Sequence, residues 1–385
     1  MKIELIHGSD YYNTQMMYFT SGSFSKDERY LYFLSDMTGC QNAYVKDTQT
    51  GEIIALSDNR RAMTYEDNTR QGIPGKGWGR PFYDPERDRL YYYQDSDLLC
   101  VDREGNKRVV TKIPADEFCS LPHVSGDGKL ICFGSAEFRI LDGYGGMDPM
   151  DIDRRILDEN LCSYINVYEI ETGKQIHREK APRGWVTHIQ FSPADSSLIL
   201  YNHEHTIVDN GIRRVWLWDG KTHRQLRTKG DGRFRDDWVC HEFWSADGKF
   251  VYWHGKIHDT YAYIGRIELA TGKIHEIMLD HRFSECYGHF SVSREGRLVS
   301  DGYWHDKDIP AARPAGAPIY PSEWITVLTP DWEKKSAEVT PVCKHSSSWK
   351  TQDDHPHPVF NDSGDMVWFT AGFDGKRKVY RVKWK

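Results

Sequence analysis

The stretch "WSADGKFVYW" (residues 244–253) begins with an aromatic residue, continues through a polar Asp-Gly turn and ends in an apolar run. Asp-Gly is a favoured hairpin turn, and the short apolar run after it is typical of a buried strand, so the stretch predicts two antiparallel strands. The pattern occurs seven times in the chain, with its first residue at Phe24, Phe82, Val124, Phe191, Trp244, Val292 and Phe360.

Most copies are followed by a second strand pair around a Gly-containing turn, as in "VYEIETGKQIH" (167–177) and "GRIELATGKIHEI" (265–277). Each repeat therefore predicts four short antiparallel strands, which make one propeller blade. We expect an all-β, seven-bladed β-propeller that forms a single domain over residues 1–385. The last copy leaves room for three strands only, so residues 1–20 are expected to supply the fourth and close the ring. Two stacked all-β domains are the alternative, but no Pro/Gly/Ser-rich linker divides the chain.

Composition is typical of a soluble globular protein, with 13% aromatic and 28% charged residues and a mean hydropathy of -0.68. The N-terminus has no apolar run of signal length and no stretch is long enough to span a membrane, which predicts a cytoplasmic protein without a membrane partner. The net charge is -7 and Lys and Arg are dispersed, which argues against a nucleic-acid partner. The eight cysteines occur singly, so neither a zinc ribbon nor a disulfide framework is predicted.

Histidines recur at one position of the repeat. The residues three positions before four consecutive anchors are His188, His241, His289 and His357. This position is the start of the innermost strand of each blade, so the four imidazoles are expected to gather at one end of the propeller. A shared position favours a metal or catalytic cluster, although any one of these histidines alone is better explained as an ordinary surface or core residue.

The segment "QDDHPH" (352–357) adds two candidates to this cluster. On an extended segment His355 points to the same face as His357, and Gln352 supplies a carbonyl oxygen. With His289 these residues make a neutral set of three nitrogens and one oxygen, which suits Mn²⁺ or another divalent transition metal. His254, His258, His281 and His305 lack the shared position, and the sequence assigns them no role.

Two loops are expected beside the cluster. "NHEHTIVDNGIRR" (202–214) contains His203 and Arg214, and a guanidinium can bind a carboxylate through two parallel hydrogen bonds. Whether Arg214 is such a clamp or an ordinary surface arginine stays open at this point. "VCKHSSSWKTQ" (342–352) brings His345 to the same end. The insertions in blades three (136–160) and six are candidate lids or walls.

Several of these segments resemble the oligogalacturonate lyase family. The similar motifs are "CKHSSSW" (343–349), "QDDHPHPVF" (352–360), "CHEFWSADG" (240–248) and "NHEHTIVDNGIRRVW" (202–216), and the likeness extends over all seven repeats. The resemblance implies a TolB-like seven-bladed propeller that cleaves short oligogalacturonides by β-elimination to 4,5-unsaturated uronates. It also implies a manganese-type ion and a short acidic oligosaccharide as the substrate.

The resemblance further implies roles for individual residues. The implied metal ligands are His289, Gln352, His355 and His357. His241 is implied as the base and Arg214 as the carboxylate clamp, while His188, His203 and His345 are candidates for substrate binding. Two alternatives stay open: a non-catalytic TolB-like propeller that binds protein or sugar, and a metal-dependent hydrolase on the same fold.

Overall fold

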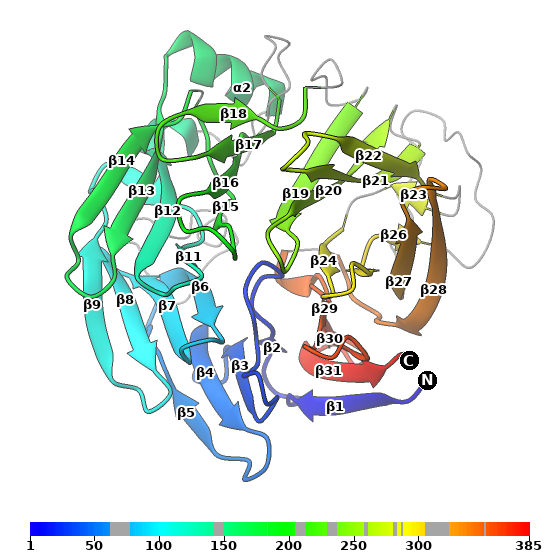
Figure 1. Ribbon diagram of the computed structural model, residues 1–385. Helices are drawn as coiled ribbons and strands as arrows, with labels where there is room; N and C mark the ends of the chain where they lie inside the picture. Colours follow the sequence, from blue (N-terminus) through cyan, green and yellow to red (C-terminus); the bar gives the residue numbers. More distant parts are fainter. Residues whose placement is uncertain are drawn as a thin grey trace. The chain divides into compact units, whose positions relative to one another are not determined.

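The computed structural model describes residues 1–61, 78–141, 149–182, 184–204, 213–228, 237–257, 261–279, 283–285, 288–304, 323–349 and 352–385. Over these residues the seven predicted repeats form seven antiparallel sheets (Figure 1). Each sheet is built from strands consecutive in the chain, except that blade six skips β26 (Tyr303–Trp304) and blade seven includes β1 (Ile3–His7). This is the strand order of a seven-bladed β-propeller, and the predicted all-β fold class is confirmed.

The first four blades have these strands. Blade one contains β2 (Thr14–Gln15), β3 (Tyr30–Ser35), β4 (Asn42–Asp47) and β5 (Ile53–Ala55). Blade two contains β6 (Trp78–Asp84), β7 (Arg89–Gln94), β8 (Asp97–Asp102) and β9 (Lys107–Lys112). Blade three contains β10 (Glu117–Cys119), β11 (His123–Val124), β12 (Leu130–Glu137), β13 (Ser163–Glu169) and β14 (Gln175–Lys180). Blade four contains β15 (Ile189–Phe191), β16 (Ile199–Asn202), β17 (Val215–Trp218) and β18 (His223–Gln225). In blade three, β10 and β11 both pair with β12, so its innermost strand is interrupted.

The last three blades follow the same plan. Blade five contains β19 (Asp237–Trp244), β20 (Phe250–Ile257), β21 (Tyr261–Glu268) and β22 (Ile274–Met278). Blade six contains β24 (Phe290–Val292), β25 (Leu298–Ser300), β27 (Trp324–Asp331) and β28 (Ser336–Lys344), with a separate ribbon of β23 (Phe283–Glu285) and β26 (Tyr303–Trp304). Blade seven contains β29 (Val359–Phe360), β30 (Met366–Ala371) and β31 (Lys378–Lys383), preceded by the 3-10 helix η3 (Gln352–Asp354).

The N-terminal strand completes blade seven, as predicted. Strand β1 (Ile3–His7) pairs antiparallel with β31, and Figure 1 shows the two strands side by side near both chain termini. Ile3 opposes Val382 and packs on the hydrophobic core of blades six and seven. The outer edge of β31 is therefore covered, which removes a surface that could pair with another chain.

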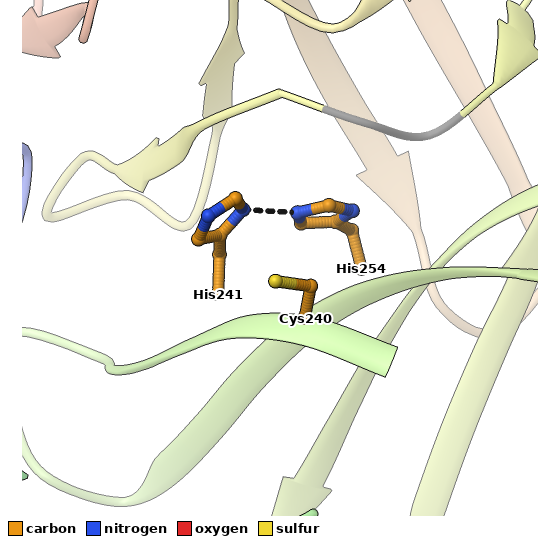
Figure 2. A group of neighbouring side chains, drawn as sticks. All are labelled: Cys240, His241 and His254. Atoms are coloured by element: carbon orange, nitrogen blue, oxygen red, sulfur yellow. Dashed lines mark hydrogen bonds between the residues drawn. The ribbon is translucent and has the colours of Figure 1, made fainter. Parts of the chain in front are cut away.

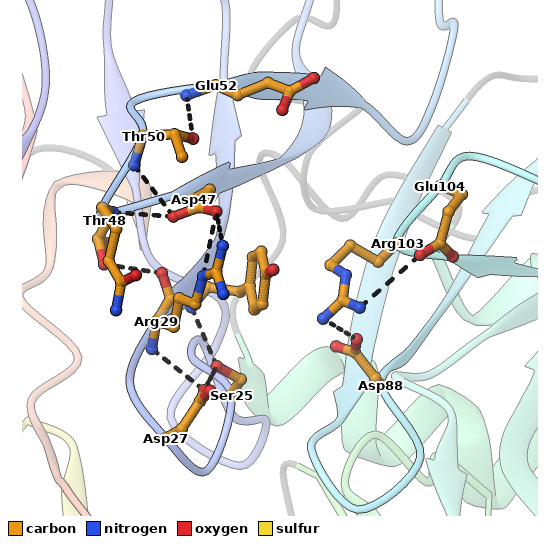
Figure 3. Close-up of polar contacts among 12 residues, drawn as sticks. Ser25, Asp27, Arg29, Asp47, Thr48, Thr50, Glu52, Asp88, Arg103 and Glu104 are labelled. Carbon is orange, nitrogen blue, oxygen red and sulfur yellow. Dashed lines mark hydrogen bonds and ion pairs between the residues drawn. The ribbon is translucent and has the colours of Figure 1, made fainter.

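The Asp-Gly turns owe their shape to a repeated local hydrogen-bond pattern. In blade five the Asp247 carboxylate accepts the backbone N–H of Lys249 at 3.1 Å, and the Ser245 hydroxyl accepts the N–H of Phe250 at 2.9 Å. Gly248 has a positive φ of 70°, which a residue without a Cβ adopts readily. Figure 3 shows the corresponding Ser25 and Asp27 pair in blade one.

The described chain divides into two compact units. The first comprises Met1–Thr20, Phe33–Met37 and Arg235–Lys385, and the second comprises Ser21–Tyr32 and Thr38–Phe234. Blades five to seven belong to the first unit and blades two to four to the second. Each unit has buried apolar clusters of its own. That the chain is a single domain stays a prediction.

The insertion in blade three contains two of the helices that the structure describes. Strand β12 leads into a 3-10 helix, η1 (Phe138–Leu141), and then into α2 (Pro149–Asp158). Ile152 and Ile156 of α2 are buried against Phe118 and Trp185 of the second unit. This apolar face holds α2 against its own blade, which is a structural role; the residues between η1 and α2 lie outside the described ranges.

Two further sequence expectations concern the environment of the protein. Among the described helices, none is long and apolar enough to cross a membrane. No disulfide joins the cysteines in the described ranges. A cytoplasmic location stays a prediction.

Candidate active site

Three of the predicted metal ligands, His289, His355 and His357, lie together in the first unit. One ring nitrogen from each lies within 4.8 Å of those of the other two, and all three side chains are buried. The imidazole centroids of His289 and His357 are 4.1 Å apart, and those of His289 and His355 are 5.2 Å apart. The fold therefore gathers donor atoms from two blades, and we refer to these residues as the histidine trio.

The backbone that presents His355 and His357 is not the extended strand that the sequence suggested. Both residues stand between η3 and β29, which begins only at Val359. His357 has a positive φ of 47°, a left-handed conformation that costs a non-glycine residue on the order of 1–3 kcal/mol. The two rings meet because of this irregular, left-handed backbone rather than because of strand alternation. A strained residue held at this point is typical of a functional site.

A buried carboxylate links two members of the trio, His289 and His357. The Asp301 carboxylate lies 3.2 Å from Nδ1 of His289 and accepts the backbone N–H of His357 at 3.1 Å. It also accepts the backbone N–H of His289. Gly288 makes this approach possible, because a Cβ there would lie 2.5 Å from the Cα of Gly302. Asp301 thus fixes one ring and two backbone segments at once.

Burial favours the neutral form of two members of the trio, His355 and His357. Loss of hydration lowers the pKa of His357 well below 6.5, helped by the neighbouring His289, and burial also lowers the pKa of His355. Burial raises the pKa of Asp301, while the nearby His357 and His355 oppose that rise. Neutral imidazoles carry the lone pairs that bind a cation, so burial favours the metal-binding form of His355 and His357.

The trio also passes a test of fit for a divalent cation. Nε2 of His357 is buried and has no hydrogen-bond partner among the described residues. An unsatisfied buried nitrogen is costly, and a bound ion would satisfy it. Imidazole nitrogens bind manganese, iron and zinc, while the carboxylate behind His289 provides the support that metal-binding histidines usually have.

His241 lies against the trio at a β-bulge. The ladder between β19 and β20 shifts between Cys240 and Phe243, and His241 in the bulge has a positive φ of 51°. Its ring centroid is 4.5 Å from that of His289. Nδ1 of His241 is hydrogen-bonded to Nε2 of His254 at 2.7 Å, as Figure 2 shows. The bulge re-aims His241, and His254 holds its ring.

Two aromatic residues of the N-terminal segment line the same place. Tyr18 packs edge-on against His357 with a centroid separation of 5.1 Å, and Phe19 packs against His241 at 5.4 Å. The segment is held by a hydrogen bond from the backbone N–H of Met16 to the Thr370 hydroxyl at 3.0 Å. The N-terminus therefore contributes both a strand to blade seven and an aromatic wall to the site.

His345 lies in the first unit and is fully buried. Its Nδ1 accepts the backbone N–H of Ser347 at 3.1 Å, and burial lowers its pKa to about 4. The Trp349 ring packs on both His345 and His355, with centroid separations of 5.9 and 4.4 Å. A role for His345 in substrate binding stays a prediction.

The predicted clamp, Arg214, belongs to the second unit. Its guanidinium is buried and lies 3.0 Å from the Glu204 carboxylate and 3.3 Å from Nδ1 of His188. His203 is buried between the rings of Tyr201 and Trp216, at 5.5 and 5.3 Å. Arg214 is therefore a positioned side chain rather than a mobile surface arginine.

Some sequence candidates lie outside the described residues. They are the side chain of Gln352, residues 205–212 of the blade-four loop, the long blade-six loop over 305–322, and His258, His281 and His305. Conversely, the structure adds Asp301 and His254, which the repeat did not single out. The sequence assigns His254 no role because it lacks the shared position, yet His254 is the hydrogen-bond partner of His241. His254 lies on β20 directly opposite Cys240 of β19, a relation that only the strand pairing reveals.

The fold and site define a seven-bladed β-propeller with a buried cluster of histidines that could hold a metal ion. The family model for oligogalacturonate lyase matches residues 9–385, so the chain belongs to the oligogalacturonate lyase family and is a lyase built on a propeller.

Solved structures support the fold. An oligogalacturonate lyase in complex with manganese is similar with a TM-score of 0.75 and 20% identity, covering 100% of this chain and 93% of that one. An oligogalacturonate lyase from Vibrio parahaemolyticus has a TM-score of 0.75 and 22% identity, covering 100% and 94%. A puromycin hydrolase is a more distant neighbour, with a TM-score of 0.56 and 12% identity over 96% of this chain and 51% of that one. Comparison with curated proteins finds no match.

Proposed function

We propose that the protein is a metal-dependent lyase that cleaves short oligogalacturonides by β-elimination and releases 4,5-unsaturated uronates. Membership of the oligogalacturonate lyase family supports the substrate class. The observation that carries the proposal is the buried histidine trio, whose His289 contacts both the Asp301 carboxylate and the His241 ring. Such a centre combines a cation site with a base, which are the two groups that this elimination needs.

The proposed metal ligands are His289, His355 and His357, with the carbonyl oxygen of Gln352 as the fourth. Manganese is the proposed ion, since it is named in the complex of a related oligogalacturonate lyase and suits nitrogen and oxygen donors. When bound, a divalent cation draws charge from the substrate carboxylate and makes the adjacent C5 proton more acidic. Neutral ligands suit this task because they leave the charge of the cation undiminished.

His241 is the proposed base. Its Nδ1 is engaged by His254, so the proton acceptor is Nε2, which holds its lone pair when Nδ1–H donates to His254. The C5–H bond breaks and its proton passes to His241, while its electron pair forms the C4=C5 double bond. The C4–O bond breaks, and the leaving oxygen departs with the electron pair of that C4–O bond and takes up a proton from solvent.

Arg214 is the proposed clamp for a substrate carboxylate. Glu204 and His188 hold its guanidinium, so little side-chain freedom is lost when a carboxylate binds. The net charge of -7 repels an anionic substrate at long range, and a buried arginine with a bound cation supplies the local attraction. His188, His203 and His345 are proposed to contact sugar hydroxyls.

The decisive experiment incubates the protein with a short oligogalacturonide and Mn²⁺ and follows the ultraviolet absorbance of the new double bond. We expect absorbance that disappears with a chelator and returns with Mn²⁺, and a His289→Ala variant that loses both bound metal and activity. New reducing ends without absorbance would identify a hydrolase. Binding without any cleavage would identify a binding module.

A further inference from the structure

A second group of metal-ligating side chains lies beside the trio and is chemically different from it. Donor atoms of Cys240, His241 and His254 all lie within 4.8 Å of one another, and all three residues are buried. We propose that these residues form an inhibitory site for a thiophilic divalent cation such as Zn²⁺, whose binding disables His241. The claim that this site binds a cation does not depend on the proposed function, whereas the claim of inhibition rests on it.

Strand pairing builds this site. Cys240 on β19 is directly opposite His254 on β20, so their side chains share one face of the sheet. Regular alternation would send His241 to the other face, but the bulge and its positive φ turn it back. Figure 2 shows the result: the two imidazoles face each other, with the Cys240 sulfur beside them.

The geometry needs only a small adjustment to hold an ion. Nδ1 of His241 and Nε2 of His254 point at each other across 2.7 Å, sharing one hydrogen. Two nitrogens that bind the same tetrahedral zinc at about 2.0–2.1 Å lie roughly 3.3 Å apart. Replacing the shared hydrogen by zinc therefore requires the rings to separate by roughly 0.6 Å. The thiolate supplies a third ligand.

The thiol separates the two sites by metal preference. The trio offers only imidazole nitrogens, which manganese in excess can occupy, whereas a thiolate adds a strong preference for zinc and other soft cations over manganese. A thiolate also brings one negative charge to a buried position, which offsets the cost of placing a dication there. We therefore expect Mn²⁺ to fill the trio and Zn²⁺ to reach the cysteine site even when Mn²⁺ is saturating.

Occupation would change the chemistry of His241. A neutral imidazole has one N–H and one lone pair, and a metal on Nδ1 takes the lone pair there and leaves the hydrogen on Nε2. Nε2 is the atom that the proposed elimination needs as proton acceptor. Zinc would thus stop the reaction without displacing manganese.

Co²⁺ gives a direct test of binding, because thiolate coordination adds a ligand-to-metal charge-transfer absorption in the near ultraviolet. The samples are the Mn²⁺-loaded wild type, Cys240→Ser, and Cys343→Ser, whose thiol is also buried in the first unit. We expect the absorption in the wild type and in Cys343→Ser but not in Cys240→Ser. Its absence from the wild type would overturn the site, whatever the lyase activity is.

Zn²⁺ titration at saturating Mn²⁺ then tests the inhibition, with each variant compared with its own rate without zinc. Removing the thiolate should weaken inhibition by about 10- to 100-fold or more, since even supporting residues of metal sites have effects of that size. Cys343→Ser should behave as the wild type does. Inhibition that is unchanged in Cys240→Ser, or that excess Mn²⁺ relieves, would overturn the proposal. Circular dichroism checks folding, and Cys240→Ala replaces the serine variant if that variant is unfolded.

Discussion

Nδ1 of His289 lies 3.2 Å from the carboxylate of Asp301, and both side chains are completely buried. The same carboxylate accepts backbone hydrogen bonds from His289 and His357. With Nδ1 committed to Asp301, Nε2 is the nitrogen that His289 presents to a cation. Asp301 therefore sets both the ring direction of His289 and the spacing between two proposed ligands, His289 and His357.

The first prediction follows from this contact. Asp301→Asn should lower the affinity for Mn²⁺ by about 10- to 100-fold, because residues that support a metal-binding histidine have effects of this size. Metal titration followed by calorimetry measures it without reference to activity. Asp362→Asn is the matched control, since Asp362 pairs with Arg294 on the surface. Equal affinity in both variants would show that Asp301 only maintains the fold.

The second prediction concerns His241. His241→Ala should reduce the rate of absorbance growth by about 10²- to 10⁴-fold, as expected for loss of a general base, while the bound metal stays at the wild-type level. Elemental analysis of the same sample separates base from ligand. His177→Ala, at an exposed position on β14, is the control. Loss of metal together with activity would make His241 a ligand instead.

Sequence reasoning found the fold because each blade repeats its turn chemistry. The turn in blade five depends on local hydrogen bonds to Ser245 and Asp247 and on the positive φ of Gly248. These features need no distant partner, so the sequence alone predicts them. The sequence also predicted that His289 and His357 lie close together, since both precede the first strand of their blades.

The sequence did not predict the roles of Asp301 and His254, because those roles depend on residues that are distant in the chain. Asp301 acts through two neighbours from different blades, and His254 through strand pairing and a bulge at His241. Neither relation leaves a periodic mark in the sequence. The meeting of His355 and His357 was anticipated, but through strand alternation, whereas the left-handed backbone at His357 produces it.

The third prediction tests the clamp. Arg214→Ala should raise KM for an oligogalacturonide substantially and leave Mn²⁺ affinity unchanged, because the guanidinium is proposed to bind a substrate carboxylate. Arg214→Lys should restore binding only in part, since an ammonium lacks the two-pronged geometry. Arg224→Ala, at an exposed position on β18, is the control. A KM equal to that of the control would remove Arg214 from substrate binding.

The fourth prediction concerns ring closure. Deleting residues 1–8 removes β1 and leaves the edge of β31 exposed, so the melting temperature should fall by several degrees and aggregation should increase. Leu5→Ala is the control, because Leu5 is 51% exposed and its backbone pairing is retained. Scanning calorimetry and light scattering measure the two effects. An unchanged melting temperature after the deletion would mean that β1 is dispensable.

The fifth prediction is a pH dependence of stability that originates away from the metal centre. His123 in β11 packs on Phe82 with a centroid separation of 4.7 Å, and its Nδ1 accepts the backbone N–H of Phe191 at 3.2 Å. Burial lowers the pKa of His123 to about 4, against 6.5 in the unfolded chain. Between these values the unfolded state binds more protons, so stability is full above pH 6.5 and falls as the pH drops toward 4.

The His123 contribution can be isolated by substitution. His123→Asn keeps a hydrogen-bond acceptor near the position of Nδ1 but cannot titrate. Between pH 7 and 4 its free energy of unfolding should therefore fall by about 1–3 kcal/mol less than that of the wild type. Denaturant unfolding at the two pH values measures the difference. His177→Asn, at an exposed position on β14, should show the same decrease in the free energy of unfolding between the two pH values, which is the wild-type slope. If His123→Asn also kept that slope, the imidazole would be reaching water in the folded state, and the packing against Phe82 would not be what holds it neutral.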